Sequence, residues 1–414
     1  MKILFLNKRP LFPVDTGGRV RTLNVVRHLA RWHSVTYLCS YDPTNDSPEA
    51  LEQLRALGLR VETEPWSEVP RNSWRFPVDL ARNLLSPDPY NAAKDFDPRL
   101  RRRAEALLAE ERPDLVICDF VQMARNVIGL PGVATLLFQH NVEAEIFERH
   151  SRVDRGWLRR RFMGYQAAKM RWFEGWAGRQ FDSIVAVSER DLEQYRQRYG
   201  WEHATAIDTA VDIDYYQAAT QTPERHTAVF VGSLDWMPNE DGLEWFADSI
   251  WPLVRQRVPD ARMRLVGRRP GSRIQRLASI PGIELVGEVP DTRPEIARGA
   301  LVAVPLRSGG GTRLKIFEAM ASGRPVISTS LGAEGLQVTH GRDILLADTA
   351  EDFASAVSRL LESPTERAQL ATAARKLVED KFSSEAIARQ FEAICLTAVS
   401  RHRERAAAAG GPPR

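Results

Sequence analysis

A glycine-rich segment at residues 305–325 has the residue types and spacing of an anion-binding site. It reads PLRSGGGTRLKIFEAMASGRP, with Gly309, Gly310 and Gly311 between an apolar run and a helical pattern that starts near Thr312. Glycines let backbone N–H groups approach a ligand, and the N-terminus of a helix favours negative charge. The segment therefore predicts a loop that binds an anion such as a phosphate.

Two cations and one carboxylate follow on the same helical pattern. Arg313 and Lys315 add positive charge, and at about 100° per residue Lys315 shares a polar face with Glu318. A carboxylate binds phosphate poorly but accepts hydrogen bonds from ribose hydroxyls. Together these residues predict a nucleoside diphosphate site, although the sequence has neither GxGxxG after its first apolar run nor GxxxxGK[ST]. The alternative is a flexible loop followed by a surface ion pair.

Two further positions lie where apolar runs give way to loops. Gly17 and Gly18 precede a helical pattern at about 19–32, so a diphosphate or a sugar could approach the backbone there; a plain helix entry is the alternative. His140 ends the run TLLFQH. Ligands of α/β proteins gather at the carboxyl ends of parallel strands, so His140 is a candidate for substrate contact, with a purely structural role as the alternative.

Aspartate pairs do not support a metal site. DxD strings occur at Asp95/Asp97, before an Arg-rich helical stretch, and at Asp212/Asp214, in an expected interdomain stretch. Such strings are common by chance, so we reject both as metal ligands. We expect neither a metal nor a cofactor.

Residues 152–179 combine basic and aromatic side chains. Eight Lys and Arg residues stand against two acidic residues, a local charge of +6, and they are interleaved with Trp157, Phe162, Trp172, Phe173 and Trp176. A basic, aromatic helix suits an anionic membrane surface or a lipid-diphosphate acceptor. The alternative, which the sequence slightly favours, is a solvated helix whose aromatic side chains pack on the first domain.

The composition is that of a globular enzyme. The chain has 414 residues, 43% apolar and 27% charged, with a net charge of +3, which excludes a polycation that coats nucleic acid. Cys39, Cys118 and Cys395 lie in apolar runs without metal-ligand spacing, which indicates buried thiols and a reducing cytoplasm. The N-terminus has no signal-peptide pattern and no run is long enough to span a membrane, so membrane contact would be peripheral.

Apolar runs alternate with helical patterns along the chain. Continuous Val, Ile and Leu runs are typical of strands buried on both faces of a parallel sheet. We expect a first series of strands at 2–7, 34–40, 59–63, 114–118, 135–140 and 183–188. After a polar break at 218–226, we expect a second series at 227–232, 262–267, 283–287, 301–306, 325–329 and 343–347, with helices near 240–257 and 313–322.

Two successive series of this kind predict two doubly wound, Rossmann-like α/β domains that face each other across a cleft. We place the first domain at 1–218 and the second, donor-binding domain at 219–383. A helix at 384–405 would pack back across the domains, and AAAAGGPPR at 406–414 would be a disordered tail.

In these residues the chain resembles a bacterial glycosyltransferase of family 4, the large retaining group with the GT-B fold. GGGTRLKIFEAMASGRPVIST is similar to the donor-binding signature of that family. Weaker matches occur in the same order as in the family: the glycine pair at 17–18, FQHNVE, VAVSERD, TAVDIDYY and FVGSLDWMPNEDGLEWF. The resemblance spans nearly the whole chain.

The resemblance implies metal-independent transfer of a sugar, with retention, from a nucleoside diphosphate donor. It implies that Glu318 holds the donor ribose and that the turn around Val289 meets the base through its backbone. Arg313, Lys315 and the loop at 309–312 would bind the diphosphate. No cofactor is implied, because the nucleotide sugar is a substrate.

In the first domain, the resemblance implies that Gly17 and Gly18 close on the diphosphate and that His140, a catalytic residue with Glu318, contacts the transferred sugar. Two positions depart from the family pattern: Gly310 replaces the first of a usual pair of glutamates, and Ser233 replaces a common arginine. A subgroup that shares both changes resembles transferases of exopolysaccharide assembly.

The hypothesis from the sequence is a cytoplasmic glycosyltransferase of hexosyltransferase type. Its partners would be a nucleotide-sugar donor, a polysaccharide, lipid-linked or other glycoconjugate acceptor, and an anionic membrane in peripheral contact, with no nucleic acid. One alternative is a GT-B nucleotide-sugar epimerase. Another, suggested by Gly310 and Ser233, is a non-catalytic nucleotide-sugar-binding protein.

Overall fold

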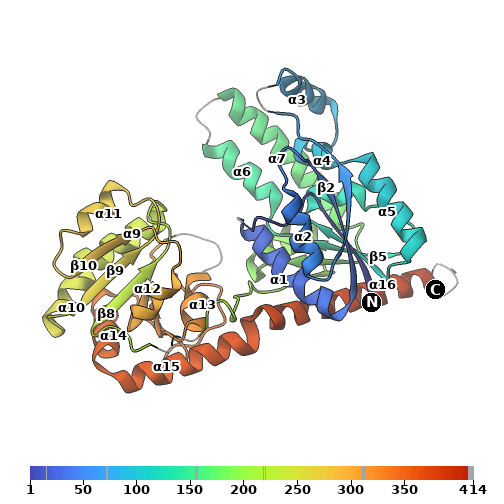
Figure 1. The fold of residues 1–414 in the computed structure, drawn as a ribbon. Coiled ribbons are helices and arrows are strands. Elements are labelled where there is room, and N and C mark those ends of the chain that lie inside the picture. Colours follow the sequence, from blue (N-terminus) through green and yellow to red (C-terminus); the bar gives the residue numbers. More distant parts are fainter. Residues whose placement is uncertain are drawn as a thin grey trace. The chain divides into compact units, whose positions relative to one another are not determined.

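The chain folds into two compact units, described here from a computed structural model (Figure 1). The structure describes residues 1–14, 16–70, 73–153, 157–217, 219, 221–308 and 314–408, without the side chains at 149–150 and 152–153. Unit 1 comprises Met1–Asp208 together with the C-terminal segment from Ile387, and unit 2 comprises Thr209–Ala386. Residues 209–218 therefore lie in unit 2 rather than in the first domain, where the sequence analysis placed them.

Unit 1 is built on a parallel sheet in the order β3-β2-β1-β4-β5-β6-β7. Its strands are β1 (Lys2–Asn7), β2 (Ser34–Tyr41), β3 (Arg60–Pro65), β4 (Leu115–Asp119), β5 (Ala134–Phe138), β6 (Ser183–Ala186) and β7 (Ala204–Ala206). Its helices are α1 (Gly17–Trp32), α2 (Pro48–Ala56), α3 (Arg75–Leu85), α4 (Tyr90–Asp95), α5 (Pro98–Glu111), the 3₁₀ helix η1 (Val121–Asn126), α6 (Glu143–Val153), α7 (Trp157–Gly178), α8 (Glu189–Tyr199) and most of α16 (Ser384–Ala408).

Unit 2 repeats the plan with the parallel order β10-β9-β8-β11-β12-β13. Its strands are β8 (Thr227–Val231), β9 (Arg262–Val266), β10 (Ile283–Gly287), β11 (Leu301–Val304), β12 (Val326–Ser328) and β13 (Leu345–Leu346). Its helices are α9 (Met237–Trp245), the π-helix η2 (Phe246–Ile250), α10 (Trp251–Arg257), α11 (Ser272–Leu277), α12 (Arg293–Arg298), α13 (Leu314–Ala321), α14 (Ala350–Glu362), α15 (Pro364–Leu377) and the π-helix η3 (Val378–Phe382).

Each sheet has one place where the chain changes direction. In unit 1 the chain leaves β1 toward β2 and β3 and returns to β4 on the other side of β1; in unit 2 the same change occurs between β8 and β11. The connections diverge at these switch points, so a crevice forms outside the carboxyl ends of the two strands. The prediction of two doubly wound, parallel α/β domains is confirmed.

Helix α16 packs on the sheet of unit 1. Phe391 is fully buried, and its ring meets the ring of Phe138, on β5, edge to face at 4.9 Å between centroids. Arg405, on the last turns of the helix, lies 3.1 Å from an oxygen of Asp182. Because most of the stability of a helix in a protein comes from tertiary packing, these contacts hold α16 in place.

Three sequence predictions about element bounds need correction. The expected helix at 152–179 is the end of α6 and the whole of α7, with 154–156 outside the described residues. The strand expected to end at His140 ends at Phe138. Of the expected tail at 406–414, residues 406–408 belong to α16, and 409–414 lie outside the described residues. All three cysteines are free and buried, and within the described part of the chain no helix has the length and apolar character to cross a bilayer.

Replacing Phe391 with alanine should destabilise unit 1 by about 3–5 kcal/mol, because it removes a fully buried ring from the contact with Phe138. Leu396→Ala on the same helix is the control, since Leu396 is 52% exposed and should change stability by less than about 0.5 kcal/mol. Chemical denaturation followed by tryptophan fluorescence measures both. Equal effects of the two substitutions would mean that α16 does not dock through Phe391.

Candidate functional site

The carboxyl ends of β1 and β4 meet at a buried carboxylate. Asp119, the last residue of β4, is fully buried. Its Oδ2 accepts hydrogen bonds from Asn7 Nδ2 at 2.7 Å and from Thr22 Oγ1, on α1, at 2.8 Å. Its Oδ1 lies 2.7 Å from His140 Nε2. Donors from three other segments thus satisfy a charge whose burial would otherwise be very costly.

This contact fixes the orientation of His140. Because Asp119 accepts the hydrogen bond, we assign the ring proton to Nε2, which leaves Nδ1 as an acceptor; among the described residues nothing bonds to Nδ1. The imidazole is 2% exposed and packs against Phe120 and Phe138, at 4.2 and 4.3 Å between centroids. The structure therefore places His140 at the switch point but covers its ring, and contact with a sugar stays a prediction.

Gly18 is required by the packing of the same cluster. A Cβ at Gly18 would lie 2.8 Å from Phe120 Cζ, whereas one at Gly17 would meet no atom within 4 Å. Phe120 itself has a φ of 69°, a left-handed conformation that strains a residue with a side chain. Gly18 thus makes room for the ring that covers His140, and Gly17 leaves the first turn of α1 open to approach.

A polar cavity of about 440 Å³ adjoins this cluster. Asn7, Thr22, Asp119 and Phe120 line part of it. Four cations and two more carboxylates also line it: Lys8, Arg9, Arg19, Lys94, Glu68 and Asp95. Its volume is within the range of about 300–1,000 Å³ usual for small-molecule sites, and its walls are far more polar than most. Unit 1 therefore has a preformed polar pocket at its switch point.

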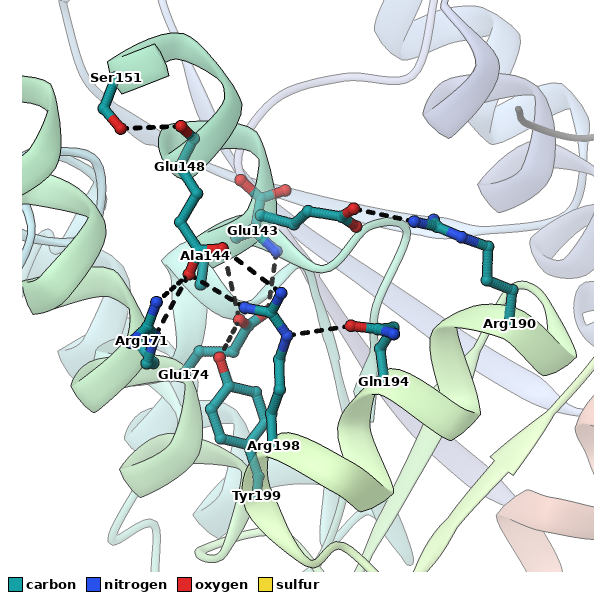
Figure 2. A network of polar contacts seen from close by, with 11 residues as sticks. Glu143, Ala144, Glu148, Ser151, Arg171, Glu174, Arg190, Gln194, Arg198 and Tyr199 are labelled. Carbon is teal, nitrogen blue, oxygen red and sulfur yellow. Dashed lines mark hydrogen bonds and ion pairs between the residues drawn. The ribbon is translucent and has the colours of Figure 1, made fainter. Parts of the chain in front are cut away.

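A second buried carboxylate holds the segment that carries His140 (Figure 2). Glu174, on α7, is fully buried. It accepts hydrogen bonds from Gln139 Nε2 (2.9 Å), from the backbone N–H groups of Glu143 (3.0 Å) and Ala144 (3.3 Å), and from the Tyr199 hydroxyl (2.7 Å). Glu174 therefore caps the first turn of α6 from a neighbouring helix and ties both sides of His140 to the core.

Burial sets the charge state of Glu174. It raises the pKa of this carboxyl to about 7, while the hydrogen bonds from Tyr199 and the backbone of Glu143 oppose the rise. Nearby Glu148 is half-buried; there too burial favours the neutral form, but hydrogen bonds from Arg171 and Arg198 outweigh it and lower the pKa. Of these two carboxyls, Glu148 on α6 and Glu174 on α7, only Glu174 changes charge near neutral pH.

In unit 2, a lysine occupies the corresponding switch point. Lys315, on α13, donates from Nζ to Asn239 Oδ1 at 2.8 Å and lies 4.4 Å from the centroid of the Phe230 ring. Asn239 in turn donates to the carbonyl of Ser233 at 2.7 Å. A Cβ at Gly232 would lie 2.7 Å from Lys315 Nζ, so a side chain there would displace the ammonium from its place at the end of β8.

Glu318 lies one turn further along α13 and contacts a residue that the sequence analysis did not single out. The Tyr216 hydroxyl interacts with its carboxylate. Burial raises the pKa of Glu318, and Tyr216 and Lys315 oppose the rise. Val289 and Tyr216 each pack against the same apolar cluster. Lys315, Glu318 and Val289 thus all lie in unit 2, and Tyr216 interacts with Glu318.

Arg268 supplies a cation beside Ser233, where the family pattern has an arginine. Its Nε donates to Ser233 Oγ at 3.2 Å from the loop after β9. The structure thus places a guanidinium from the neighbouring strand end beside Ser233. Sequence reasoning missed it because the two positions lie 35 residues apart.

Gly309, Gly310, Gly311, Thr312 and Arg313 lie outside the described residues. No group of three or more His, Cys, Asp or Glu side chains among the described residues is arranged to hold a metal ion. Of the aspartates in the DxD strings, Asp97 caps α5 and Asp212 accepts backbone N–H groups in the turn before Tyr216.

Replacing Asp119 with asparagine should reverse the tautomer of His140. The asparagine oxygen would keep the bonds from Asn7 and Thr22, so its amide N–H would face Nε2 and drive the proton to Nδ1. Nitrogen NMR of ¹⁵N-histidine-labelled protein reads the tautomer directly. Asp260→Asn, at the exposed His226–Asp260 pair, is the control and should change only the His226 signals. An unchanged His140 tautomer would contradict the assignment.

Replacing Glu174 with glutamine should change how stability depends on pH. The pKa of Glu174 is about 7 in the folded protein and about 4.3 in an unfolded chain. The folded state therefore binds the proton more tightly, so this contribution to stability is complete below about pH 4.3 and lost as pH rises through about 7. Wild type should lose melting temperature between about pH 5 and 7 relative to Glu174→Gln and change little relative to it at higher pH.

Glu148→Gln is the matched control for this experiment, because the pKa of Glu148 is lowered and the carboxyl stays ionised throughout the range. Its melting temperature should differ from that of wild type by a nearly constant amount. Parallel curves for wild type and Glu174→Gln would show that Glu174 does not titrate in this range.

Two family models match the chain. The model described as Glycosyltransferase Family 4 matches residues 16–215, and the model described as Glycosyl transferases group 1 matches residues 225–363. The first therefore falls almost wholly in unit 1 and the second wholly in unit 2. Together they include Asp119 and His140 in unit 1 and Lys315 and Glu318 in unit 2.

Two individual proteins are similar to this chain over most of its length. MMP alpha-(1->4)-mannosyltransferase of Mycolicibacterium hassiacum is 25% identical over 405 residues, which cover 91% of this chain and 94% of the relative. A 44.6 kDa protein in the cps region of Klebsiella pneumoniae is 20% identical over 298 residues, which cover 69% of this chain and 75% of that protein.

Among solved structures, HepE of Anabaena in complex with UDP has a similar fold. It aligns with a TM-score of 0.60 at 17% identity, over 95% of this chain and 99% of that chain. Two parallel α/β units of the GT-B type, each matched by a glycosyltransferase model, place the chain in the family 4 glycosyltransferases.

Proposed function

We propose that this glycosyltransferase moves a sugar, with retention and without a metal ion, from a nucleoside diphosphate donor to a glycan, lipid-linked or other glycoconjugate acceptor. We place it at the cytoplasmic side of the membrane, in peripheral contact with it, and in surface or exopolysaccharide assembly. The observation that carries the proposal is the arrangement of Lys315 and Glu318 at the switch point of unit 2. The complexes of the Anabaena neighbour with UDP and UDP-glucose support a nucleotide-sugar donor.

Unit 2 would bind the donor. Glu318 would accept hydrogen bonds from the ribose, with Tyr216 holding the carboxylate in place. The backbone near Val289, which packs against the same apolar cluster as Tyr216, would meet the base. Lys315 and Arg268 would face the diphosphate, together with the loop at 309–313.

The catalytic contribution of these cations is electrostatic. When the bond between the sugar and the diphosphate breaks, negative charge grows on the leaving phosphate. Fixed cations and N–H groups stabilise that charge without having to reorganise. Asn239 and the narrow space at Gly232 hold the ammonium of Lys315 in one position, which suits it to this role.

Unit 1 would bind the acceptor and the transferred sugar. The polar cavity beside Asp119 suits a ligand rich in hydroxyl groups. Gly17 and Gly18 would offer backbone N–H groups at the start of α1 to the diphosphate, where Gly17 is open to approach. His140, oriented by Asp119, would contact the sugar through its segment at the end of β5.

Replacing Glu318 with alanine should lower kcat/KM for the donor by roughly 10- to 100-fold, because it removes a charged acceptor of ribose hydrogen bonds. A panel of UDP-, GDP-, ADP- and dTDP-sugars, assayed for transfer and for sugar release, measures the effect. Glu362→Ala is the control, since Glu362 is exposed at the end of α14 in the same unit. Unchanged turnover in Glu318→Ala would overturn the assignment of Glu318.

The same panel separates the alternative functions. A nucleotide-sugar epimerase would convert donor to its epimer with no acceptor present. A protein that only binds would give heat on titration with a donor but no turnover with any acceptor extract. Arg268 beside Ser233 favours an active enzyme, because the position still has a cation within reach.

A further inference from the structure

Most of the large apolar side chains that unit 1 exposes lie on or next to two helices. Leu85 is 92% exposed and Trp74 is 73% exposed, at the two ends of α3. Trp157 and Leu158, at the start of α7, are 68% and 65% exposed. Soluble proteins rarely expose apolar side chains in contiguous groups without a function for them.

Helix α3 is amphipathic, and its apolar outer face is uncovered. Trp74, Val78 and Leu85 recur at the spacing that puts side chains on one side of a helix, and all three are exposed. Asn83, on the other side, is buried and accepts a hydrogen bond from Gln166, on α7. Sequence analysis did not single out this helix.

The two helices form one surface. Besides the contact at Asn83, the Tyr165 hydroxyl of α7 donates to the carbonyl of Leu84, and Lys169 Nζ donates to the carbonyl of Asn83. Figure 1 shows α3 beside α7. Further along α7, Phe173 and Glu174 are buried. Other residues there, such as Trp172, are exposed, but only at the start of α7, residues 157–161, are five consecutive residues of the helix exposed, and α3 extends this part.

The polar residues around this surface are mostly basic. Arg75 and Arg82 flank the apolar stripe of α3, with Asp79 as the carboxylate of that helix. Residues 159–161 of α7 are three consecutive arginines. The guanidinium of Arg75 lies 5.7 Å from the centroid of the Trp74 ring, so a cation and a large apolar side chain lie next to each other at the start of α3.

We propose that the surface formed by α3 and the start of α7 docks on an anionic lipid bilayer. Tryptophan and leucine insert at the boundary between headgroups and acyl chains, and arginines beside them attract anionic headgroups. A second copy of the chain fits this surface poorly, because pairing it with itself would bring its five arginines together. Charge complementarity therefore selects the bilayer as the occupant.

This surface lies against a second cavity. Asp79, Arg82 and Asn83 of α3 line a cavity of about 380 Å³ together with Trp66 and Tyr90. Lys94 lines both this cavity and the one beside Asp119. If the proposed function holds, an acceptor carried by a lipid would reach the switch point of unit 1 through these cavities while α3 rests on the bilayer.

Vesicle sedimentation of the full-length protein tests the proposal, with vesicles of phosphatidylcholine alone or mixed with phosphatidylglycerol. We expect binding to the anionic vesicles that weakens as salt is added. The double variant Trp74→Ser/Leu85→Ser should lower the partition coefficient at least roughly tenfold. Leu396→Ser, which alters an exposed leucine of α16, should bind as wild type does.

Three results would overturn the proposal. They are equal binding to neutral and anionic vesicles, no binding to either, and full binding by the double variant. Self-association that the double variant abolishes, in place of vesicle binding, would assign the surface to a second copy instead. Circular dichroism verifies that the double variant is folded. The vesicle assay contains neither donor nor acceptor, so a negative result in it does not bear on the proposed transfer reaction.

Discussion

The site of unit 1 depends on how the protein satisfies the buried carboxylate of Asp119. A charge without solvent must find donors, and here they come from the end of β1, from α1 and from the segment after β5. Satisfying that one group fixes the places where three connections leave the sheet. It also orients His140, because the imidazole is one of the donors. The same packing explains why Gly18 has no side chain, since Phe120 fills that space.

In unit 2 the charged group held at the switch point is a cation, the ammonium of Lys315. The ammonium of Lys315 lies in a space that Gly232 leaves open, and Asn239 holds it. Glu318 is fixed in a comparable way by Tyr216. In both units, charged groups at the switch point are held by neighbours before any ligand binds. Such preorganisation is what electrostatic catalysis requires, because the stabilising groups need not move as charge develops.

Local patterns predicted the fold well and the site in part. Continuous apolar runs located both sheets, and paired glycines before a helix drew attention to Gly17 and Gly18, whereas the predicted loop at 309–311 lies outside the described residues. Position relative to a strand drew attention to His140. Asp119 could have been found in the same way, since LVICD ends in an acid where ligands bind. Partners that are distant in sequence could not be found: Tyr216 meets Glu318, and Glu174 caps α6, only because the sheets bring separate segments together.

Hydrogen–deuterium exchange with a nucleotide sugar that the enzyme turns over tests the central claim most directly, namely that the donor binds at the switch point of unit 2. The account predicts slower exchange at residues 232–239, at 314–318 and around Tyr216, with α14 unchanged. Protection confined to other parts of the chain, or none at saturating donor, would contradict it.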